Sequence, residues 1–480
     1  MTSWTLKHWI GSVLILAGTA IMTVLFIKQQ VILGLMFAFI PIVLIVFFFA
    51  LDNPYWGLLI LFAENYFLMG LTRYVYVSGI GVLTDALILF ILFSALIRSI
   101  HDRDVDWKRA LNGGSLLLSV WLLYCVFEIA NSTAVTGAWI SSFRSLTFYP
   151  LAVVILTSII FKNYKSLKTI LLLYAVFTLF AVAKLQMQKS IGFDNFEWRW
   201  LMEGENSSTH LLSSGTRYFS FFTDAGNFGS NMGFAMVVFT IAAIYIKDKW
   251  MRIFFAATGF LGMYAMFVSG TRGAIAVPFA GFFLFTILSK KIKVFVASIL
   301  FIAVIFSFFM FTNIGQGNQY IRRMRTAFDP NEPSLMVRLD NQKRLAQYIK
   351  TRPFGEGIGL SGVAAKRFDP NRLTTNIPND SWYVKVWVET GLVGLLLFIS
   401  IQMYFIIYGG YLVFYKIKNK ELKGIVTAMI CGIFGVMVSS YGNAFYGQYP
   451  TCILVSMMQA FIIISPHYDK EIESSIIKIE

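Results

Sequence analysis

Three arginines and one aspartate stand at positions of this sequence where their side chains could do chemistry. Arg272 begins a long apolar segment, and Arg217 lies a few residues before another. Arg338 falls on the apolar stripe of an amphipathic segment, and Asp380 precedes a third apolar segment. A guanidinium fits phosphate oxygens, and a carboxylate can accept a proton from a hydroxyl group. The set therefore predicts a binding site for phosphate or diphosphate beside a general base.

Each of these residues also has a purely structural interpretation. Arg272 could extend toward lipid headgroups, and Arg338 could pair with Asp340 or with a distant acid. Asp380 could cap the helix that follows it. We nevertheless expect the three arginines to share one anion site, because all are predicted to face the same side near the membrane surface, where charges are often functional.

Long apolar segments must position these residues. The chain has 480 residues, of which 57% are apolar and 14% are charged, whereas soluble domains contain about 25% charged residues. Residues 31–50 carry no charge, and about 20 apolar residues cross a bilayer as a helix. Strand-type alternation, which a membrane barrel would require, is absent from the sequence. The sequence therefore predicts an all-α, polytopic membrane helical bundle of about 14 transmembrane helices.

The expected spans follow from the apolar segments and the charges between them. They are 8–27, 31–50, 54–71, 78–98, 111–131, 147–161, 169–187, 226–246, 251–269, 272–289, 293–313, 383–409, 424–444 and 449–466. Each short loop with a cluster of basic residues follows an even-numbered span, from the fourth span onward, and such clusters mark cytoplasmic loops. We therefore expect both termini in the cytoplasm and the first span to be retained rather than cleaved as a signal peptide.

This topology predicts three regions. Residues 1–314 hold transmembrane helices 1–11 with a shorter periplasmic loop at 188–225, and residues 315–382 form a large periplasmic loop. Residues 383–480 hold helices 12–14 and a cytoplasmic tail. The large loop is rich in arginine and lysine, which suits an anionic partner such as a phosphate or diphosphate group. The simpler alternative is a basic loop that pairs with anionic membrane lipids.

Within the large loop, residues 333–350 (PSLMVRLDNQKRLAQYIK) have the apolar spacing of an amphipathic helix. Leu339, Leu345 and Ile349 belong to its apolar stripe. Arg338 lies seven residues before Leu345 and therefore on the same face. An arginine on that face needs an anionic partner.

Other functions are disfavoured by the sequence. The net charge of +15 could suggest nucleic acid, but the basic loops explain it, so we expect no nucleic-acid partner. The three cysteines lie within apolar runs and the four histidines are scattered, so we expect no disulfide framework, no metal site and no cofactor.

Three motifs occur in a characteristic order: 269–274 (SGTRGA), 352–359 (RPFGEGIG) and 380–394 (DSWYVKVWVETGLVG). Together with the hydropathy profile and the large loop, they resemble the O-antigen ligase and O-antigen polymerase superfamily over about residues 200–400. The glycines of the second motif could present backbone N–H groups to an anion, although tight loop geometry explains them equally well.

The resemblance implies a metal-independent, inverting membrane glycosyltransferase of the bacterial inner membrane with a periplasmic active site. Its donor would be an undecaprenyl-diphosphate-linked oligosaccharide, and its acceptor a glycan or lipid-linked glycan. Membrane lipids and a chain-length regulator are further candidate partners. The family's conserved arginines hold the diphosphate, a role implied for Arg272 by its motif and for Arg217 and Arg338 by less specific positions.

One departure from the family pattern bears on the acceptor. Ligases of the superfamily have a His-Asn pair where this chain has Asp380 and Ser381. We therefore expect a repeat-unit polymerase with Asp380 as the base, while a ligase to lipid A core and a protein O-oligosaccharyltransferase stay open. A lipid-linked glycan flippase, with buried charges such as Glu64, Glu128 and Lys184, and an envelope scaffold are the alternatives of other classes.

Overall fold

A computed structural model describes most of the chain beyond residue 52. The described residues are 18–19, 23, 53–75, 79, 81–101, 105–203, 206–212, 215–290, 292–329 and 332–477. The expected spans 8–27 and 31–50 lie outside them, except for residues 18, 19 and 23.

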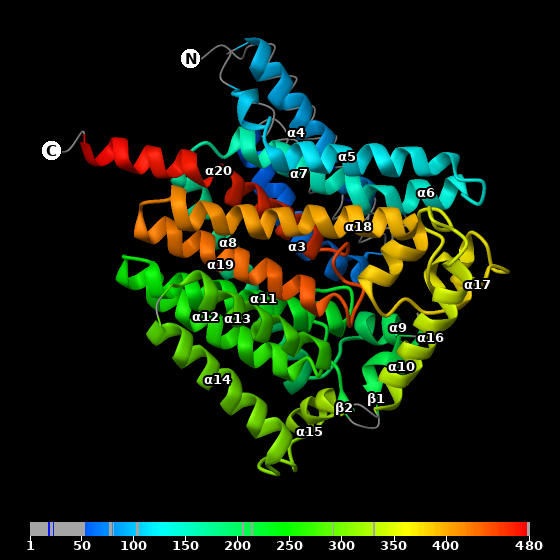
Figure 1. Cartoon of the computed structure of the whole chain (residues 1–480). Coiled ribbons are helices and arrows are strands. Elements are labelled where there is room, and N and C mark those ends of the chain that lie inside the picture. Colours follow the sequence, from blue (N-terminus) through cyan, green and yellow to red (C-terminus); the bar gives the residue numbers. More distant parts are fainter. Residues whose placement is uncertain are drawn as a thin grey trace.

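The described chain is a helical bundle in which each remaining expected span coincides with a helix (Figure 1). Its long helices are α3 (Pro54–Tyr74), α4 (Gly81–His101), α5 (Gly113–Phe127), α8 (Tyr164–Ser190), α11 (Ala225–Tyr245), α12 (Lys249–Val268), α13 (Ala276–Leu288), α14 (Ile292–Phe311), α18 (Trp382–Tyr411), α19 (Lys420–Ser439) and α20 (Thr451–Ile477). In the described ranges, nine helical segments are long and apolar enough to cross a membrane. The protein is therefore a multi-pass helical membrane bundle, and the number fourteen stays a prediction.

The expected span 147–161 starts eleven residues too late. The structure has one helical segment, Thr136–Ile160, made of α6 (Thr136–Phe143), a π-helical turn η3 (Arg144–Phe148) and α7 (Tyr149–Ile160). Pro150 lies within this segment and lacks the N–H that would bond the Leu146 carbonyl oxygen in a regular α-helix. The wider π turn accommodates it, and Trp121 Nε1 donates to the Leu146 carbonyl oxygen at 3.0 Å.

The last helix is also longer than expected. α20 continues through Pro466 to Ile477, whereas the predicted span ended at residue 466. Tyr468 is fully buried and donates to the Phe161 carbonyl oxygen at 2.6 Å. Contacts with the preceding bundle thus extend the helix beyond its apolar run.

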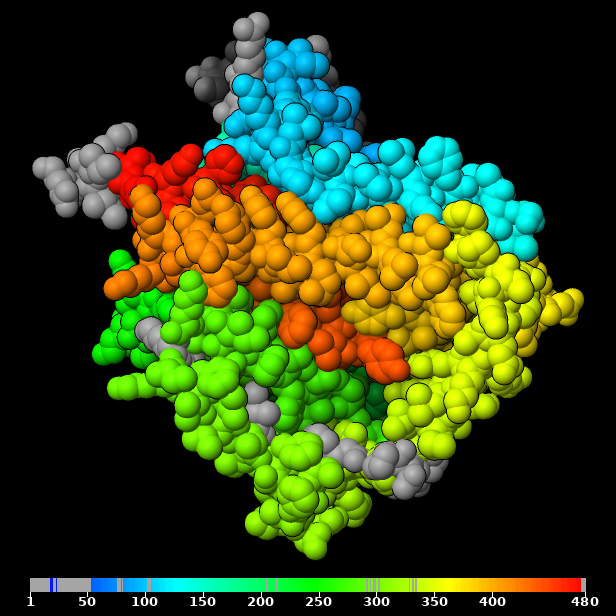
Figure 2. Space-filling view, in the orientation of Figure 1, coloured from blue at the N-terminus to red at the C-terminus, as the bar shows by residue number. Residues whose placement is uncertain are grey.

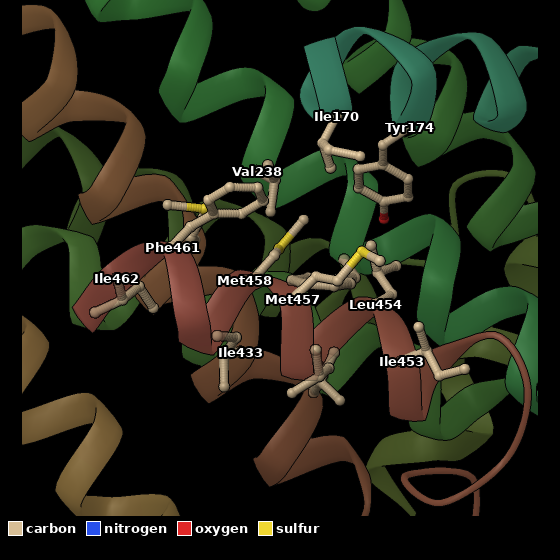
Figure 3. Packing of buried hydrophobic residues seen from close by; sticks show 14 of the residues in the cluster. Ile170, Tyr174, Val238, Ile433, Ile453, Leu454, Met457, Met458, Phe461 and Ile462 are labelled. Carbon is tan, nitrogen blue, oxygen red and sulfur yellow. The ribbon is translucent and has the colours of Figure 1, made fainter. Parts of the chain in front are cut away.

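Helices α11, α19 and α20 form the centre of the bundle. In Figure 3, Met457, Met458 and Phe461 of α20 pack near Val238 of α11 and Tyr174 of α8. Glycines let the helices approach closely: a Cβ at Gly435 of α19 would collide with the Val277 carbonyl oxygen of α13. Such contacts replace the hydrophobic drive that lipid cannot supply between membrane helices.

Short elements gather at one end of the bundle, which we call the loop end (bottom and right of Figure 1). They are α9 (Asn195–Glu203), α10 (Ser207–His210), β1 (Leu211–Leu212), β2 (Gly215–Thr216), α15 (Gln319–Arg325), η5 (Thr326–Phe328), α16 (Pro333–Ile349), η6 (Val363–Arg367) and α17 (Leu373–Asn376). The strands pair as an antiparallel ladder. The chain also forms the short turns η1 (Trp107–Arg109), η2 (Glu128–Ala130), η4 (Arg272–Ile275) and η7 (Leu412–Lys416).

The amphipathic helix predicted at 333–350 is α16. Its C-terminal half is the part that packs against the rest of the protein. Leu345 and Ile349 are buried and pack with Ile377 and Val388. Leu339, expected on the same stripe, is 37% exposed. α16 therefore lies against the first turns of α18 through its C-terminal half, and its N-terminal half carries Arg338.

Candidate functional site

A polar cavity of about 380 Å³ lies at the loop end and contains all four residues singled out from the sequence. We call it the arginine cavity. Figure 2 shows the surface hollowed where the orange-red chain before α20, yellow α16 and the green helices meet. The cavity is lined by Asn206, Thr209, His210, Arg217, Asp224, Thr271, Arg272, Gly273, Arg323, Arg338, Asp380, Gly442 and Asn443. Segments far apart in the sequence thus bring four arginines to one place.

Arg272 stands where the turn after α12 leads into η4. Gly270 has φ +64°, a conformation that glycine adopts without strain, and Thr271 Oγ1 donates to the Ala225 carbonyl oxygen at 2.6 Å. Arg272 Nη1 lies 2.5 Å from Oε1 of Glu332. The side chain therefore faces a protein carboxylate, which differs from the alternative in which it extends to lipid headgroups.

Arg217 follows β2 and is held by neutral oxygens. Its guanidinium donates to the Thr209 carbonyl oxygen at 3.0 Å and to Thr271 Oγ1 at 3.1 Å. Burial lowers the pKa of Arg217, and the positive charges of Arg272 and Arg338 lower it further, although Asp224 opposes them. A cation in such surroundings favours the arrival of an anion.

Arg338 and Asp380 both line the cavity, and their side chains form an ion pair. Arg338 Nε lies 3.6 Å from Asp380 Oδ2, and each side chain is about a third exposed. The distant acid envisaged for Arg338 is therefore Asp380. The capping role considered for Asp380 is not observed, because the N-cap of α18 is Ser381 and it makes no side-chain capping bond.

The sequence interpretation did not include Arg323 of α15 among the site residues. Its Nε donates to the Gly270 carbonyl oxygen at 2.5 Å. Burial lowers the pKa of Arg323 to about 10, and Arg217 and Arg272 lower it too. Its neighbour Met324 is fully buried, so an apolar residue within an arginine-rich run was the signal that this segment docks. Gly442 and Asn443 carry no comparable signal in the sequence.

The two other titratable residues that line the cavity, Asp224 and His210, form hydrogen bonds with backbone groups. Asp224 caps α11, because its Oδ1 accepts from the N–H groups of Gly226 and Asn227 at 2.6 and 2.9 Å. His210 contacts the Asn206 carbonyl oxygen through Nδ1, and its Nε2 accepts from the Ala225 N–H at 3.3 Å. Burial lowers the pKa of His210 to about 4, so the ring is neutral near pH 7. Asp380 is the other carboxylate of the cavity lining. Among the described hydrogen bonds, none is donated to it by a backbone N–H.

The motif 352–359 docks on α18 rather than on the cavity. The N–H groups of Glu356 and Gly357 donate to the Val388 and Glu389 carbonyl oxygens at 2.8 and 3.1 Å. Gly391 breaks the helical conformation there with φ +68°. These two motif N–H groups are therefore occupied by carbonyl groups of α18, and the motif lies against the helix between Val388 and Gly391.

An apolar groove of about 490 Å³ adjoins the arginine cavity and shares Arg272, Gly273 and Arg338 with it. Its other lining residues come mainly from η4, α13, α14 and the segment from η5 to α16, and they include Ile275, Ala276, Phe279, Phe306 and Leu335. The lining of the groove is mostly apolar, and the shared residues Arg272 and Arg338 lie where the groove meets the cavity. An amphiphile with an anionic head and a hydrocarbon tail fits this arrangement.

No group of three or more His, Cys, Asp or Glu residues able to hold a metal ion occurs in the described part of the chain. The buried charges considered for a transporter lie in local networks. Lys184 pairs with Asp194 and Glu197 at 3.2 and 3.0 Å, and Glu64 accepts from Thr84 at 2.7 Å.

Comparison with known proteins identifies the family. Residues 255–399 match the family model described as O-antigen ligase, and no curated protein matches the chain significantly. The matched region runs from α12 into α18 and includes Arg272, Arg323, Arg338 and Asp380, while Arg217 lies before it. The family implies a ligase or glycosyltransferase type of activity with a lipid-linked glycan donor and an acceptor. The match confirms the resemblance seen in the three motifs: residues 255–399, which contain all three, match the O-antigen ligase family and support a relationship to the O-antigen ligase and polymerase superfamily of membrane enzymes.

Proposed function

We propose that this protein is an inverting membrane glycosyltransferase that polymerises polyprenyl-diphosphate-linked oligosaccharide repeat units. In this proposal it lies in the bacterial inner membrane with cytoplasmic termini and a periplasmic active site. Undecaprenyl diphosphate carries the donor glycan, and a second lipid-linked glycan is the acceptor. A chain-length regulator is a further candidate partner.

The observation that carries the proposal is the convergence of Arg217, Arg272, Arg323 and Arg338 on one cavity. Four guanidinium groups outnumber the two lining aspartates, Asp224 and Asp380. Preorganised cations stabilise the charge that develops on a leaving group, and they are most effective where water is partly excluded. A diphosphate has the charge and the oxygen geometry that such a set of guanidinium groups recognises.

The apolar groove supports a lipid-linked donor. It meets the cavity at Arg272 and Arg338, so a diphosphate held by these arginines would place the first isoprene units beside Phe279 and Leu335. Because the polyprenyl chain comes from lipid that is equally apolar, close packing in the groove, rather than removal from water, would hold it there. The cavity and the groove together fit the two halves of one polyprenyl diphosphate.

In the proposed reaction, Asp380 accepts the proton of an acceptor hydroxyl as that oxygen attacks the anomeric carbon of the donor. The bond between this carbon and the phosphate oxygen breaks, and its electron pair passes to the diphosphate. One displacement inverts the anomeric configuration. The arginines stabilise the departing diphosphate, so the step requires no metal ion.

We favour a polymerase because Asp380 occupies the position at which ligases of the superfamily have histidine. His210, which also lines the cavity, does not replace that histidine, because both of its ring nitrogens contact backbone groups. A ligase to lipid A core and a protein O-oligosaccharyltransferase would use the same donor and are separated by their acceptors.

The test uses the full chain reconstituted with a lipid-linked oligosaccharide. Arg272→Ala and Asp380→Asn should each abolish formation of longer glycans. Arg322→Ala and Asp340→Asn, which change exposed residues of α15 and α16, should leave it intact. Full activity of both site variants would overturn the mechanism. Translocation of the lipid without extension would identify a flippase instead.

A further inference from the structure

The ion pair between Arg338 and Asp380 is loosely held. The Nε–Oδ2 distance of 3.6 Å is longer than a hydrogen bond, and both side chains are about a third exposed. Arg338 is carried by α16 and Asp380 by the chain just before α18. The pair can therefore separate without disturbing a buried network.

The other lining carboxylate cannot play the same part. Asp224 is fixed by two backbone N–H groups at the start of α11. Glu332, the partner of Arg272, caps α16 by accepting from the Leu335 N–H at 2.8 Å, and it lines the groove rather than the cavity. Asp380 thus combines contact with the cavity, a cationic partner and freedom from helix capping.

The charge of the substrate changes during the proposed reaction. A diphosphate esterified at both ends carries about two negative charges, and the diphosphate that leaves gains about one more near neutral pH. The acceptor hydroxyl meanwhile loses a proton. An efficient site would supply one additional positive charge at the moment when the leaving group needs it.

We propose that Arg338 is a switchable ligand of the leaving diphosphate, released from Asp380 when Asp380 takes the acceptor proton. Before transfer, Asp380 neutralises Arg338 and the cavity matches the donor. As the proton moves to Asp380, the carboxyl group becomes neutral, and the guanidinium of Arg338 turns to the new charge on the diphosphate. This inference rests on the proposed function, and it couples activation of the acceptor to departure of the leaving group.

The inference predicts that a neutral residue at position 380 imitates the state after proton transfer. The purified full chain in nanodiscs is titrated with farnesyl diphosphate, a soluble polyprenyl diphosphate with the same free head group as the product. Asp380→Asn should bind it about tenfold more tightly than the wild type. The gain should vanish in the Arg338→Gln background, while Asp340→Asn, a matched change on α16, should not alter binding.

The outcomes separate the two proposals. If the wild-type protein extends glycans and binds farnesyl diphosphate, but Asp380→Asn binds no more tightly, the switch is wrong and the proposed function stands. If the wild-type protein binds no polyprenyl diphosphate, the proposed function fails together with the switch. A gain that persists in Arg338→Gln would also overturn the role of Arg338.

A second measurement does not depend on the Asp380 variant. Arg338→Gln should weaken inhibition by the product about tenfold and lower kcat, with a smaller change in the KM for the donor. An Arg338 that merely supports the fold would change kcat, KM and product inhibition alike or none of them. Arg344→Gln, at an exposed position of the same helix, is the control.

Discussion

Gly391 of α18 lies directly against Pro353 of the docked motif. A Cβ at Gly391 would overlap the Pro353 carbonyl oxygen, and the glycine has φ +68°. Position 391 is therefore restricted both by space and by backbone conformation. This contact joins the second sequence motif to the third, and the third begins with the cavity residue Asp380.

We expect Gly391→Ala to destabilise the protein. With φ +68° and ψ −172°, Gly391 occupies a backbone region that is essentially restricted to glycine and costs other residues about 1–3 kcal/mol, and the overlap with backbone adds to this cost. Thermal unfolding in detergent should show a lower melting temperature than for Gly410→Ala. A Cβ at Gly410, on the same helix, would meet its nearest atom, Leu288 Cδ2, at an ordinary 3.5 Å. Equal melting temperatures would contradict the tight contact.

Arg323 should illustrate a conflict between binding and stability. Its pKa is lowered to about 10, chiefly by burial, so the folded state disfavours its charge at neutral pH. Arg323→Met should therefore raise or preserve the melting temperature without ligand and reduce the increase produced by a polyprenyl diphosphate. The exposed neighbour Arg322→Met is the control. A variant that keeps the full ligand-induced increase would exclude Arg323 from the anion site.

The same pKa shift sets a pH dependence. Arg323 stays protonated well below pH 10, so its contribution to ligand-induced stabilisation should be constant between about pH 7 and 9. As the pH rises through about 10, loss of its proton should reduce that stabilisation in the wild type. The Arg323→Met variant should lack this component, which differential scanning fluorimetry with and without ligand can measure.

How much of this arrangement could be predicted depends on the range of the signals. The helices follow from local apolar runs, and Arg272 and Asp380 follow from motifs at helix starts. Arg323 lacked such a signal, because its place depends on docking of α15 through Met324. The helix start at Thr136 was missed, because a π turn and a distant tryptophan satisfy the backbone around Pro150. Long-range contacts of this kind do not appear in local spacing.

His210 should make the protein sensitive to acid. Its folded pKa is about 4, below the ordinary value of about 6.5, so the fold favours the neutral ring. The stabilisation is complete above about pH 6.5 and is lost as the pH falls from there toward 4. His210→Gln should melt at a lower temperature near pH 7 and lose less stability over that interval. His101→Gln, at an exposed position, should follow the wild type.

Ala276 should determine how well the apolar groove accepts a polyprenyl chain. Its side chain lines the groove beside Arg272, so Ala276→Trp would fill the space proposed for the first isoprene units. We expect the KM for a polyprenyl-linked donor to rise at least about tenfold, which corresponds to about 1.4 kcal/mol of binding. Phe283→Trp, at a 51% exposed position of the same helix, introduces the same residue outside the groove. If both variants keep the wild-type KM, the lipid chain does not occupy this groove.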